Sequence, residues 1–142
     1  MRILDIEQND INGGSFAVTA AKKGSTLTSN DAVINWMLEE EIRMGLNTEK
    51  PYREFAERVE AHKTSLLDLL DRLKNDGKKI IGYGASTKGN VLLQYCGIDT
   101  RYLECIAEVN EQKFGSYTPG TLIPIVSEAE AKAMKPDYLF VL

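Results

Sequence analysis

Cysteine and histidine are scarce in this chain. Its 142 residues include two cysteines and one histidine. Cys96 and Cys105 both lie in apolar surroundings and do not form the close Cys or His spacings of a metal site. We therefore expect no metal and no disulfide, and predict that both cysteines are buried, reduced thiols.

The chain also lacks a long apolar run and an excess of basic residues. A membrane span needs roughly 20 apolar residues in succession, and a secretory signal needs an apolar core with a cleavage site. The formal net charge of −4 argues against a nucleic-acid partner and against binding to an anionic membrane. A reducing, cytoplasmic location is the expectation that remains.

What the sequence does contain is typical of a globular protein. Hydrophobic residues make up 43% of it and charged residues 27%. The length suits one compact domain overall, with little room for two. The chain ends on a predicted strand and begins with a hairpin that needs a neighbour. We therefore expect it to be a fragment of a longer protein.

Residues 1–28 predict a β-hairpin. Residues 2–8 alternate apolar and polar side chains, which is typical of a strand, and residues 15–22 predict a second strand. The segment between them is dense in Asn, Asp and Gly, the residues that favour turns.

Residues 29–77 predict a pair of helices. The first covers about 31–44, with Ser29, Asn30 and Asp31 able to cap its start. The second covers about 51–75 and has Pro51 in its first turn. Its predicted apolar seam comprises Phe55, Val59, His62, Leu66, Leu69 and Leu73.

Residues 78–142 predict strands that alternate with helices. We expect strands at 79–83, 102–109, 122–126 and 137–142, and helices at 87–95 and 127–134. This alternation is typical of a parallel sheet with helical crossovers. The predicted fold class is therefore α/β, a Rossmann-like parallel sheet with flanking helices, preceded by a β-hairpin and a long helical pair.

A Gly-rich turn follows the first strand of this region and opens a helix. Gly82-Tyr83-Gly84 has the context of a dinucleotide-binding fingerprint, although the third position is Thr87 and the small residue comes later. Such a turn lets a ligand approach the backbone, and the helix start offers free N–H groups to a phosphate. The candidate phosphate-binding residues are Gly82, Tyr83, Gly84, Ala85, Ser86, Thr87, Lys88, Gly89 and Asn90. The alternative is a plain tight turn that binds nothing.

Four further residues are candidates for the same site. Glu108 ends the next strand, about where an acidic residue would bind a ribose hydroxyl. Lys113 and the turn pair Pro119-Gly120 lie in the loop that follows, which starts at the carboxyl edge of the sheet. Ligands of open α/β sheets bind at that edge. The alternative for this loop is a solvated connection.

The chain offers no convincing pair of nucleophile and base. His62 and Trp36 are each expected in the core or at its rim, with His62 as a general base the less favoured alternative. We therefore predict no catalytic residue in this chain.

Two segments of the sequence carry a resemblance to a known family. Residues 82–98, GYGASTKGNVLLQYCGI, and residues 108–125, EVNEQKFGSYTPGTLIPI, resemble signatures of S-adenosylmethionine-dependent sugar C-methyltransferases of the NDP-hexose 3-C-methyltransferase type. Both lie in the C-terminal domain of that family. Asn12-Gly13-Gly14-Ser15 resembles the turn between the last two strands of the family's methyltransferase domain.

The resemblance implies a nucleotide-sugar-binding domain, with dTDP or a similar nucleotide as the carrier. In the family, S-adenosylmethionine is bound by a central domain, and zinc by an N-terminal domain. The general base also lies upstream, so the parent protein would be a C-methyltransferase and this chain its substrate-binding piece. The chain departs from the family pattern at Ala17, Glu108 and Leu122, where the family often has Arg, Asp and His. Its sugar contacts can therefore differ.

Two other interpretations remain open from the sequence alone. The chain can be a stand-alone Rossmann-like nucleotide-binding module, or a domain whose long helical pair binds a partner protein. Neither would have catalytic activity.

Overall fold

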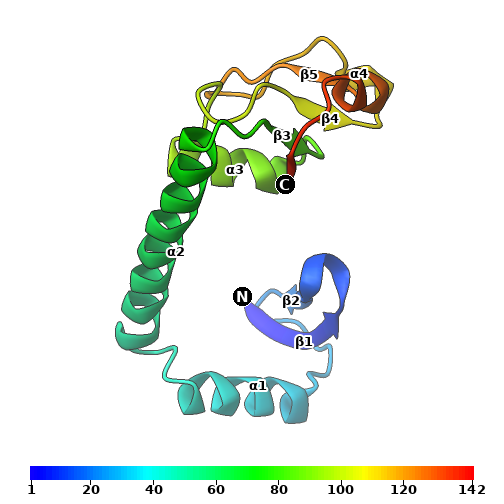
Figure 1. Ribbon diagram of the computed structural model, residues 1–142. Helices are drawn as coiled ribbons and strands as arrows, with labels where there is room; N and C mark the ends of the chain where they lie inside the picture. Colours follow the sequence, from blue (N-terminus) through cyan, green and yellow to red (C-terminus); the bar gives the residue numbers. More distant parts are fainter. The chain divides into compact units, whose positions relative to one another are not determined.

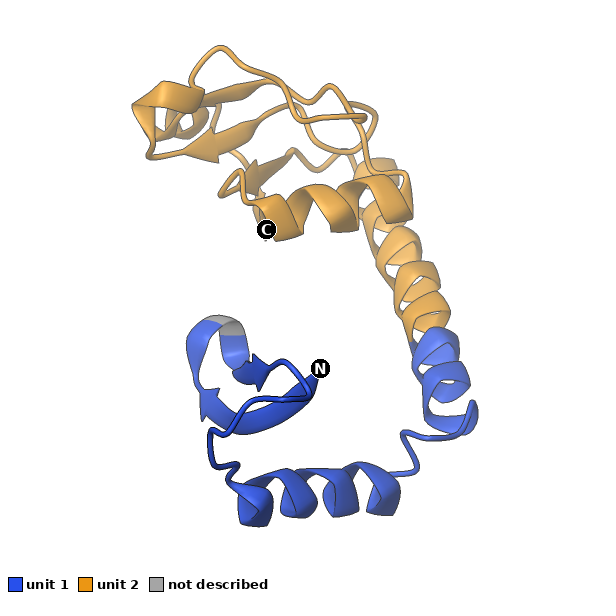
Figure 2. Ribbon diagram, turned by 180° about the vertical axis from the view of Figure 1, so that it is seen from behind, with its two compact units in different colours: residues 1–58 blue, residues 59–142 orange. Residues whose placement is uncertain are grey.

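We describe the chain from a computed structural model, which covers all of residues 1–142 except the side chain of Asn12. The predicted role of Asn12 in the Gly-Gly-Ser turn therefore lies outside the described residues. The chain divides into two compact units, Met1–Arg58 and Val59–Leu142 (Figure 2). The sequence had predicted one compact domain overall.

The first unit begins with the predicted hairpin. Strands β1, Arg2–Asn9, and β2, Ser15–Ala21, pair antiparallel, and a short 3-10 helix, η1 at Ile11–Gly13, joins them. Helix α1, Asp31–Arg43, packs against β1. The backbone N–H of Asn30 donates to the carbonyl of Leu4 over 2.7 Å, and this bond fixes the start of the helix beside the strand.

The predicted cap of α1 is wrong in its chemistry. Asn30 occupies the cap position, but its side chain makes no cap hydrogen bond. Its amide donates instead to the carboxylate of Asp5 over 3.1 Å.

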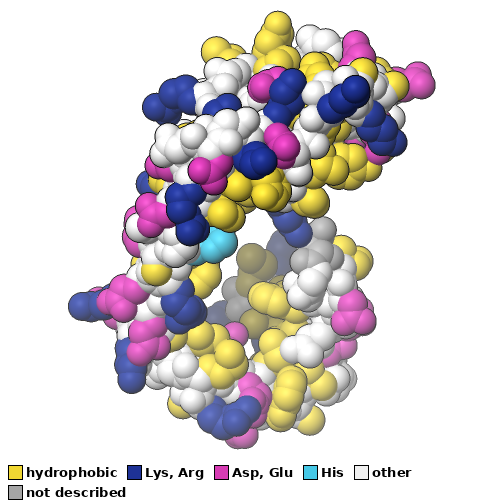
Figure 3. Space-filling view, in the orientation of Figure 1, with side chains coloured by type: hydrophobic (Ala, Val, Ile, Leu, Met, Phe, Trp, Pro, Cys, Tyr) yellow, Lys and Arg dark blue, Asp and Glu magenta, His cyan; other side chains and the backbone are white. Residues whose placement is uncertain are grey.

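Trp36 was expected in the core or at its rim and is 52% exposed. Figure 3 shows hydrophobic side chains at the surface of this unit, and Leu4 is the one hydrophobic residue buried among its described residues.

Helix α2, Lys50–Asn75, begins in the first unit and ends in the second. Its buried side agrees with the predicted seam at Leu66 and Leu73 and differs from it elsewhere. Leu70 is buried, and Leu66, Leu67 and Leu73 pack against the same core. His62 is exposed, as the cyan side chain in Figure 3 shows, so its expected place in the core is wrong.

The second unit holds a four-stranded parallel sheet (Figure 1). Its strands are β3, Ile80–Tyr83; β4, Ile106–Glu108; β5, Ile125–Ser127; and β6, Tyr138–Val141. They lie in the order β5-β4-β3-β6, with every neighbouring pair parallel. The predicted fold class is therefore confirmed. The strands predicted at 102–109 and 122–126 begin too early. Tyr102 and Leu103 form a turn on the carbonyl of Asp99, and Leu122 has a φ of +54° and donates its N–H to Thr118.

Helices cover both faces of this sheet. Helix α3, Thr87–Cys96, and the end of α2 pack on one face, where the core includes Ile80, Leu93, Ile98, Ile106 and Ile123. Helix α4, Glu128–Ala133, covers the other face over Ile81, Cys105 and Ala107. Ser127 and Glu130 form a capping box at the start of α4. Cys96 and Cys105 are free and buried, as predicted.

The strand order places the sheet's switch point beside the Gly-rich turn. From β3 the chain crosses through α3 to β4 on one side, and later through α4 to β6 on the other. Crossovers between parallel strands share the same handedness. Two crossovers that run in opposite directions across the sheet therefore place their helices on opposite faces of it. At such a point the loops separate and leave a crevice at the carboxyl ends of the strands. Here the switch point lies between β3 and β6.

None of the helices that the structure describes combines the length and the apolar character of a membrane span.

Candidate functional site

The Gly-rich turn between β3 and α3 owes its shape to close packing. A Cβ added to Gly82 would lie 2.7 Å from Cγ1 of Ile106, and one added to Gly89 would lie 2.6 Å from Cβ of Leu142. Gly84 has a φ of +86°, which disfavours any side chain. Three of the predicted turn residues are thus required by backbone geometry and packing. A glycine at these places is not by itself a sign of a ligand.

The start of α3 leaves two backbone donors free. Ser86 is the cap residue, and its Oγ accepts the N–H of Gly89 over 2.9 Å. The N–H of Asn90 donates to the carbonyl of Ser86. The N–H groups of Thr87 and Lys88 have no acceptor among the described residues. Free N–H groups at a helix start, together with the helix dipole, favour an anion.

Lys88 adds a full positive charge to the same first turn. Its side chain is exposed and makes no ion pair with the described residues. The helix dipole disfavours a cation in a first turn. A bound anion would offset that effect, because it would lie near both the free N–H groups and the ammonium group.

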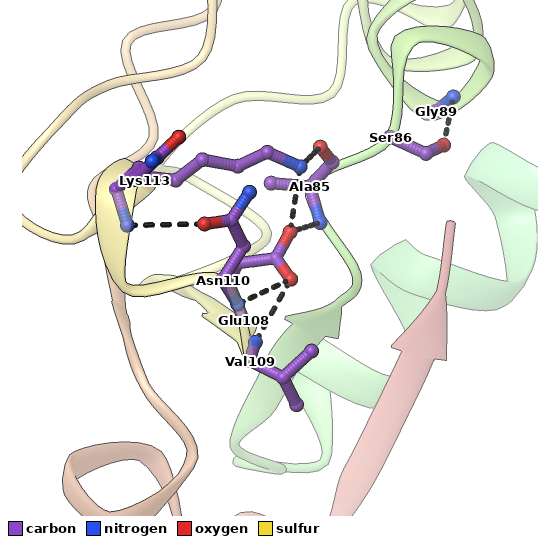
Figure 4. Close-up of polar contacts among 8 residues, drawn as sticks. Ala85, Ser86, Gly89, Glu108, Val109, Asn110 and Lys113 are labelled. Carbon is purple, nitrogen blue, oxygen red and sulfur yellow. Dashed lines mark hydrogen bonds and ion pairs between the residues drawn. The ribbon is translucent and has the colours of Figure 1, made fainter.

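Glu108 contacts the turn itself (Figure 4). One carboxylate oxygen accepts the N–H of Ala85 and the ammonium of Lys113, each over 3.0 Å. The other accepts the N–H groups of Val109, over 2.8 Å, and Asn110, over 3.1 Å. These four donors use the acceptor positions of a carboxylate. A ribose hydroxyl could bind Glu108 only if one of them were displaced.

The environment of Glu108 favours its charged form. The side chain is 9% exposed. Hydrogen bonds from the N–H of Asn110, from Lys113, and from the N–H groups of Val109 and Ala85 lower the pKa of Glu108 from its ordinary 4.5 to about 2, against the opposing effect of burial. Glu108 therefore carries a full negative charge at neutral pH.

Lys113 lies in the short 3-10 helix η2, Glu111–Lys113, which follows β4. Its ammonium group donates to the carbonyl of Ala85 over 2.8 Å and to Glu108 (Figure 4). The structure thus brings Ala85, Glu108 and Lys113 together at one edge of the sheet. Sequence reasoning named all three but gave no sign that they contact one another.

Tyr83 points away from this cluster, to the α4 face of the sheet. Its hydroxyl donates a short hydrogen bond to Glu128 at the start of α4. That bond raises the pKa of Tyr83 and lowers the pKa of Glu128. Glu128 is a residue of this edge that sequence reasoning missed, and no local pattern marks it. The side chain of Tyr83 therefore does not face the free N–H groups of α3.

Pro119 and Gly120 lie away from the Gly-rich turn. The loop leaves the carboxyl edge at Lys113, runs beside the start of β5, and turns there. Gln94 of α3 donates to the carbonyl of Pro119 over 3.0 Å and contacts Gly120. Gln94 lies about two turns, roughly 10 Å, along α3 from Thr87. The turn pair lines a separate depression of about 620 Å³ with Asp99 and Arg101.

The described residues contain no cluster of three or more His, Cys, Asp or Glu side chains that could hold a metal ion. The geometry at the start of α3 offers N–H donors and one ammonium group for an anion. Two carboxylates nearby, Glu108 and Glu128, already have hydrogen-bond donors. What the arrangement offers chemically is a set of hydrogen-bond donors that suits an anion.

Comparison with known proteins identifies the family. Residues 10–142 match the family described as the C-methyltransferase C-terminal domain. The chain belongs to this family. It is also 37% identical, over all 142 of its residues, to C-methyltransferase NovU of Streptomyces niveus. That alignment covers 34% of NovU, so the chain spans about one third of this relative's length.

Membership of the C-methyltransferase C-terminal domain family confirms what residues 82–98 and 108–125 predicted. Both segments lie within the matched range. The Gly-rich turn, Glu108 and Lys113 of this chain thus lie within such a C-terminal domain.

Proposed function

We propose that this chain binds the nucleotide-sugar substrate of a C-methyltransferase, with the start of α3 holding the diphosphate. The observation that carries the proposal is the pair of free N–H groups at Thr87 and Lys88, in a first helical turn that also bears the exposed side chain of Lys88. They lie at the switch point of the sheet, where open α/β folds bind ligands. A diphosphate supplies the anion that these donors favour.

The substrate in this proposal is a keto sugar carried on dTDP or a similar nucleotide. The support is the resemblance of residues 82–98 and 108–125 to sugar C-methyltransferases, together with membership of the C-methyltransferase C-terminal domain family. The departures at Ala17, Glu108 and Leu122 leave room for a different sugar. Pro119 and Gly120, two turns away along α3, are the weaker members of the predicted site.

The methyl donor, S-adenosylmethionine, would bind elsewhere in the parent enzyme. A donor nucleoside held at this turn would need an acidic residue free to accept its ribose hydroxyls. Glu108 is at the corresponding place, but its carboxylate already accepts four donors. The same proposal leaves zinc and the general base to other parts of the parent protein. The substrate-binding role of this chain would be to hold and orient the nucleotide sugar.

A methyl-transfer assay tests this function. The parent protein, supplied with S-adenosylmethionine labelled in its methyl group, should transfer label to a 4-keto sugar linked to dTDP or UDP. The free sugar, which lacks the diphosphate, should be a far poorer substrate at the same concentration. Equal transfer to the free sugar and to the nucleotide sugar would contradict a diphosphate site.

A further inference from the structure

Both polar groups of the Ala85 peptide segment are held by side chains from the next strand and its loop. The N–H of Ala85 donates to Glu108 over 3.0 Å, and the carbonyl of Ala85 accepts from Lys113 over 2.8 Å. Glu108 and Lys113 also contact each other over 3.0 Å. Figure 4 shows the three groups in one closed set of contacts. Ala85 is itself buried, and it directly precedes the cap residue Ser86.

These contacts determine where the first turn of α3 lies. The turn is otherwise held by short backbone bonds, from Gly84 to Ala107 and from Ser86 to Gly84. Glu108 and Lys113 fix the residue between them from a second strand. Because the free N–H groups of Thr87 and Lys88 follow within three residues, any rotation at Ala85 would redirect them. Phosphate binding by N–H groups depends on their direction.

The same contacts use the acceptor positions of Glu108 and two of the three ammonium donors of Lys113. Glu108 has no acceptor position left, and its negative charge lies beside the positive charge of Lys113. The two charges offset each other locally. Lys88 then supplies the positive charge of the first turn that is not already paired.

We propose that Glu108 and Lys113 are positioning residues, which orient the Gly-rich turn for the diphosphate and do not contact the substrate. This proposal rests on the proposed function, since it names what orients the same site. It reassigns two residues that the sequence predicted as ligands. Lys113 is the decisive one, because an exposed lysine near a phosphate site would ordinarily be taken as a phosphate ligand.

Hydrogen exchange in the full-length parent protein tests the proposal. The variants are Glu108→Gln and Lys113→Met, with Glu128→Gln as the matched control. The control makes the same carboxylate-to-amide change at the same sheet edge, where Glu128 accepts from Tyr83 and not from the turn. Exchange would be followed by mass spectrometry in peptides that cover residues 84–88, with peptides of α2 as the internal reference. Affinity for dTDP and UDP would be measured by calorimetry on the same samples.

We expect both variants to exchange roughly tenfold faster in residues 84–88 than the wild type, because a buried charge-assisted bond is lost. We also expect both to bind either nucleotide roughly tenfold more weakly. The double variant should be little worse than either single one, because the two residues act as a unit. Glu128→Gln should leave exchange in residues 84–88 and affinity unchanged.

A different pattern would overturn the proposal. If Lys113→Met weakened nucleotide binding but left exchange in residues 84–88 unchanged, Lys113 would be a direct phosphate ligand. If neither variant changed exchange there, the turn would hold its shape without them. If Glu108→Gln failed to fold, Lys113→Met would still test the positioning role. Lys113 is partly exposed, so its substitution should leave the fold intact. If the wild type bound neither nucleotide, the proposed function would fail while the exchange result still decided the positioning role.

Discussion

Gly82 on β3 lies so close to Ile106 on β4 that there is no space between them for a methyl group. A Cβ at Gly82 would stand 2.7 Å from Cγ1 of Ile106, which is fully buried. Gly82→Ala should therefore destabilise the chain by about 1–3 kcal/mol, because a packed core yields little to an added carbon. Urea unfolding of the two proteins measures this difference.

The matched control for Gly82 is Gly24, in the loop that follows β2. A Cβ added there meets nothing within 4 Å. Gly24→Ala should change the free energy of unfolding by no more than about 0.5 kcal/mol. Equal effects of the two substitutions would show that close packing is not the reason for Gly82.

Acid should weaken the fold partly through Glu108. Its pKa is about 2 in the folded chain and near its ordinary 4.5 when unfolded. A carboxyl with a depressed folded pKa stabilises the fold above its unfolded pKa, and that contribution is lost as pH falls towards the folded pKa. The loss is on the order of 3 kcal/mol over the whole window. Unfolding of the wild type and of Glu108→Gln from about pH 5 to about pH 3 measures part of it.

We expect the wild type to be the more stable protein at the upper end of that range. The difference in their free energies of unfolding should narrow as pH falls. The reason is that the amide that replaces the carboxyl group in Glu108→Gln cannot titrate. Parallel curves for the two proteins would contradict the assigned pKa.

Both thiols should be inert in the folded chain. Burial is the largest cause that raises the pKa of Cys96 and of Cys105. Because the thiolate is the reactive form, a thiol reagent at neutral pH should react slowly with the native chain and quickly after unfolding in urea. Fast reaction of either cysteine in the native chain would show that it is accessible.

Local rules predicted the parts of the fold that local contacts build. The Gly-rich turn and the helices predicted at 87–95 and 127–134 depend on residues close together in the sequence, such as the caps at Ser86 and Ser127. Their patterns are therefore visible in the sequence. The sheet followed, because alternating strands and helices leave few arrangements.

The sequence-based predictions failed where contacts between residues far apart in the sequence determine the structure. Leu103 is fully buried and was assigned to a strand, yet it belongs to a turn on Asp99 and packs into the core from there. In α2 the predicted seam included Leu69, but Leu70 faces the core. An apolar side chain indicates that a residue is buried. It does not by itself indicate whether the residue belongs to a strand, a helix or a turn.

The candidate site likewise has a part that local sequence predicts and a part that depends on distant residues. The free N–H groups at Thr87 and Lys88 follow from the helix start, which sequence reasoning located. The contacts of Ala85 with Glu108 and Lys113 join residues 23 and 28 positions apart. Nothing in the local sequence marks such pairs, so the predicted ligand roles of Glu108 and Lys113 could not be tested before the structure.

The central claim is that the first turn of α3 holds a diphosphate with help from Lys88. The most direct measurement is calorimetry of the parent protein with dTDP and UDP, in the wild type, Lys88→Ala and Lys132→Ala. Lys132 is the control because it is an exposed lysine of α4, paired with Glu128. We expect Lys88→Ala to bind roughly tenfold more weakly, with less salt dependence, and Lys132→Ala to bind like the wild type. Equal affinity of all three proteins, or no binding by the wild type, would contradict the claim.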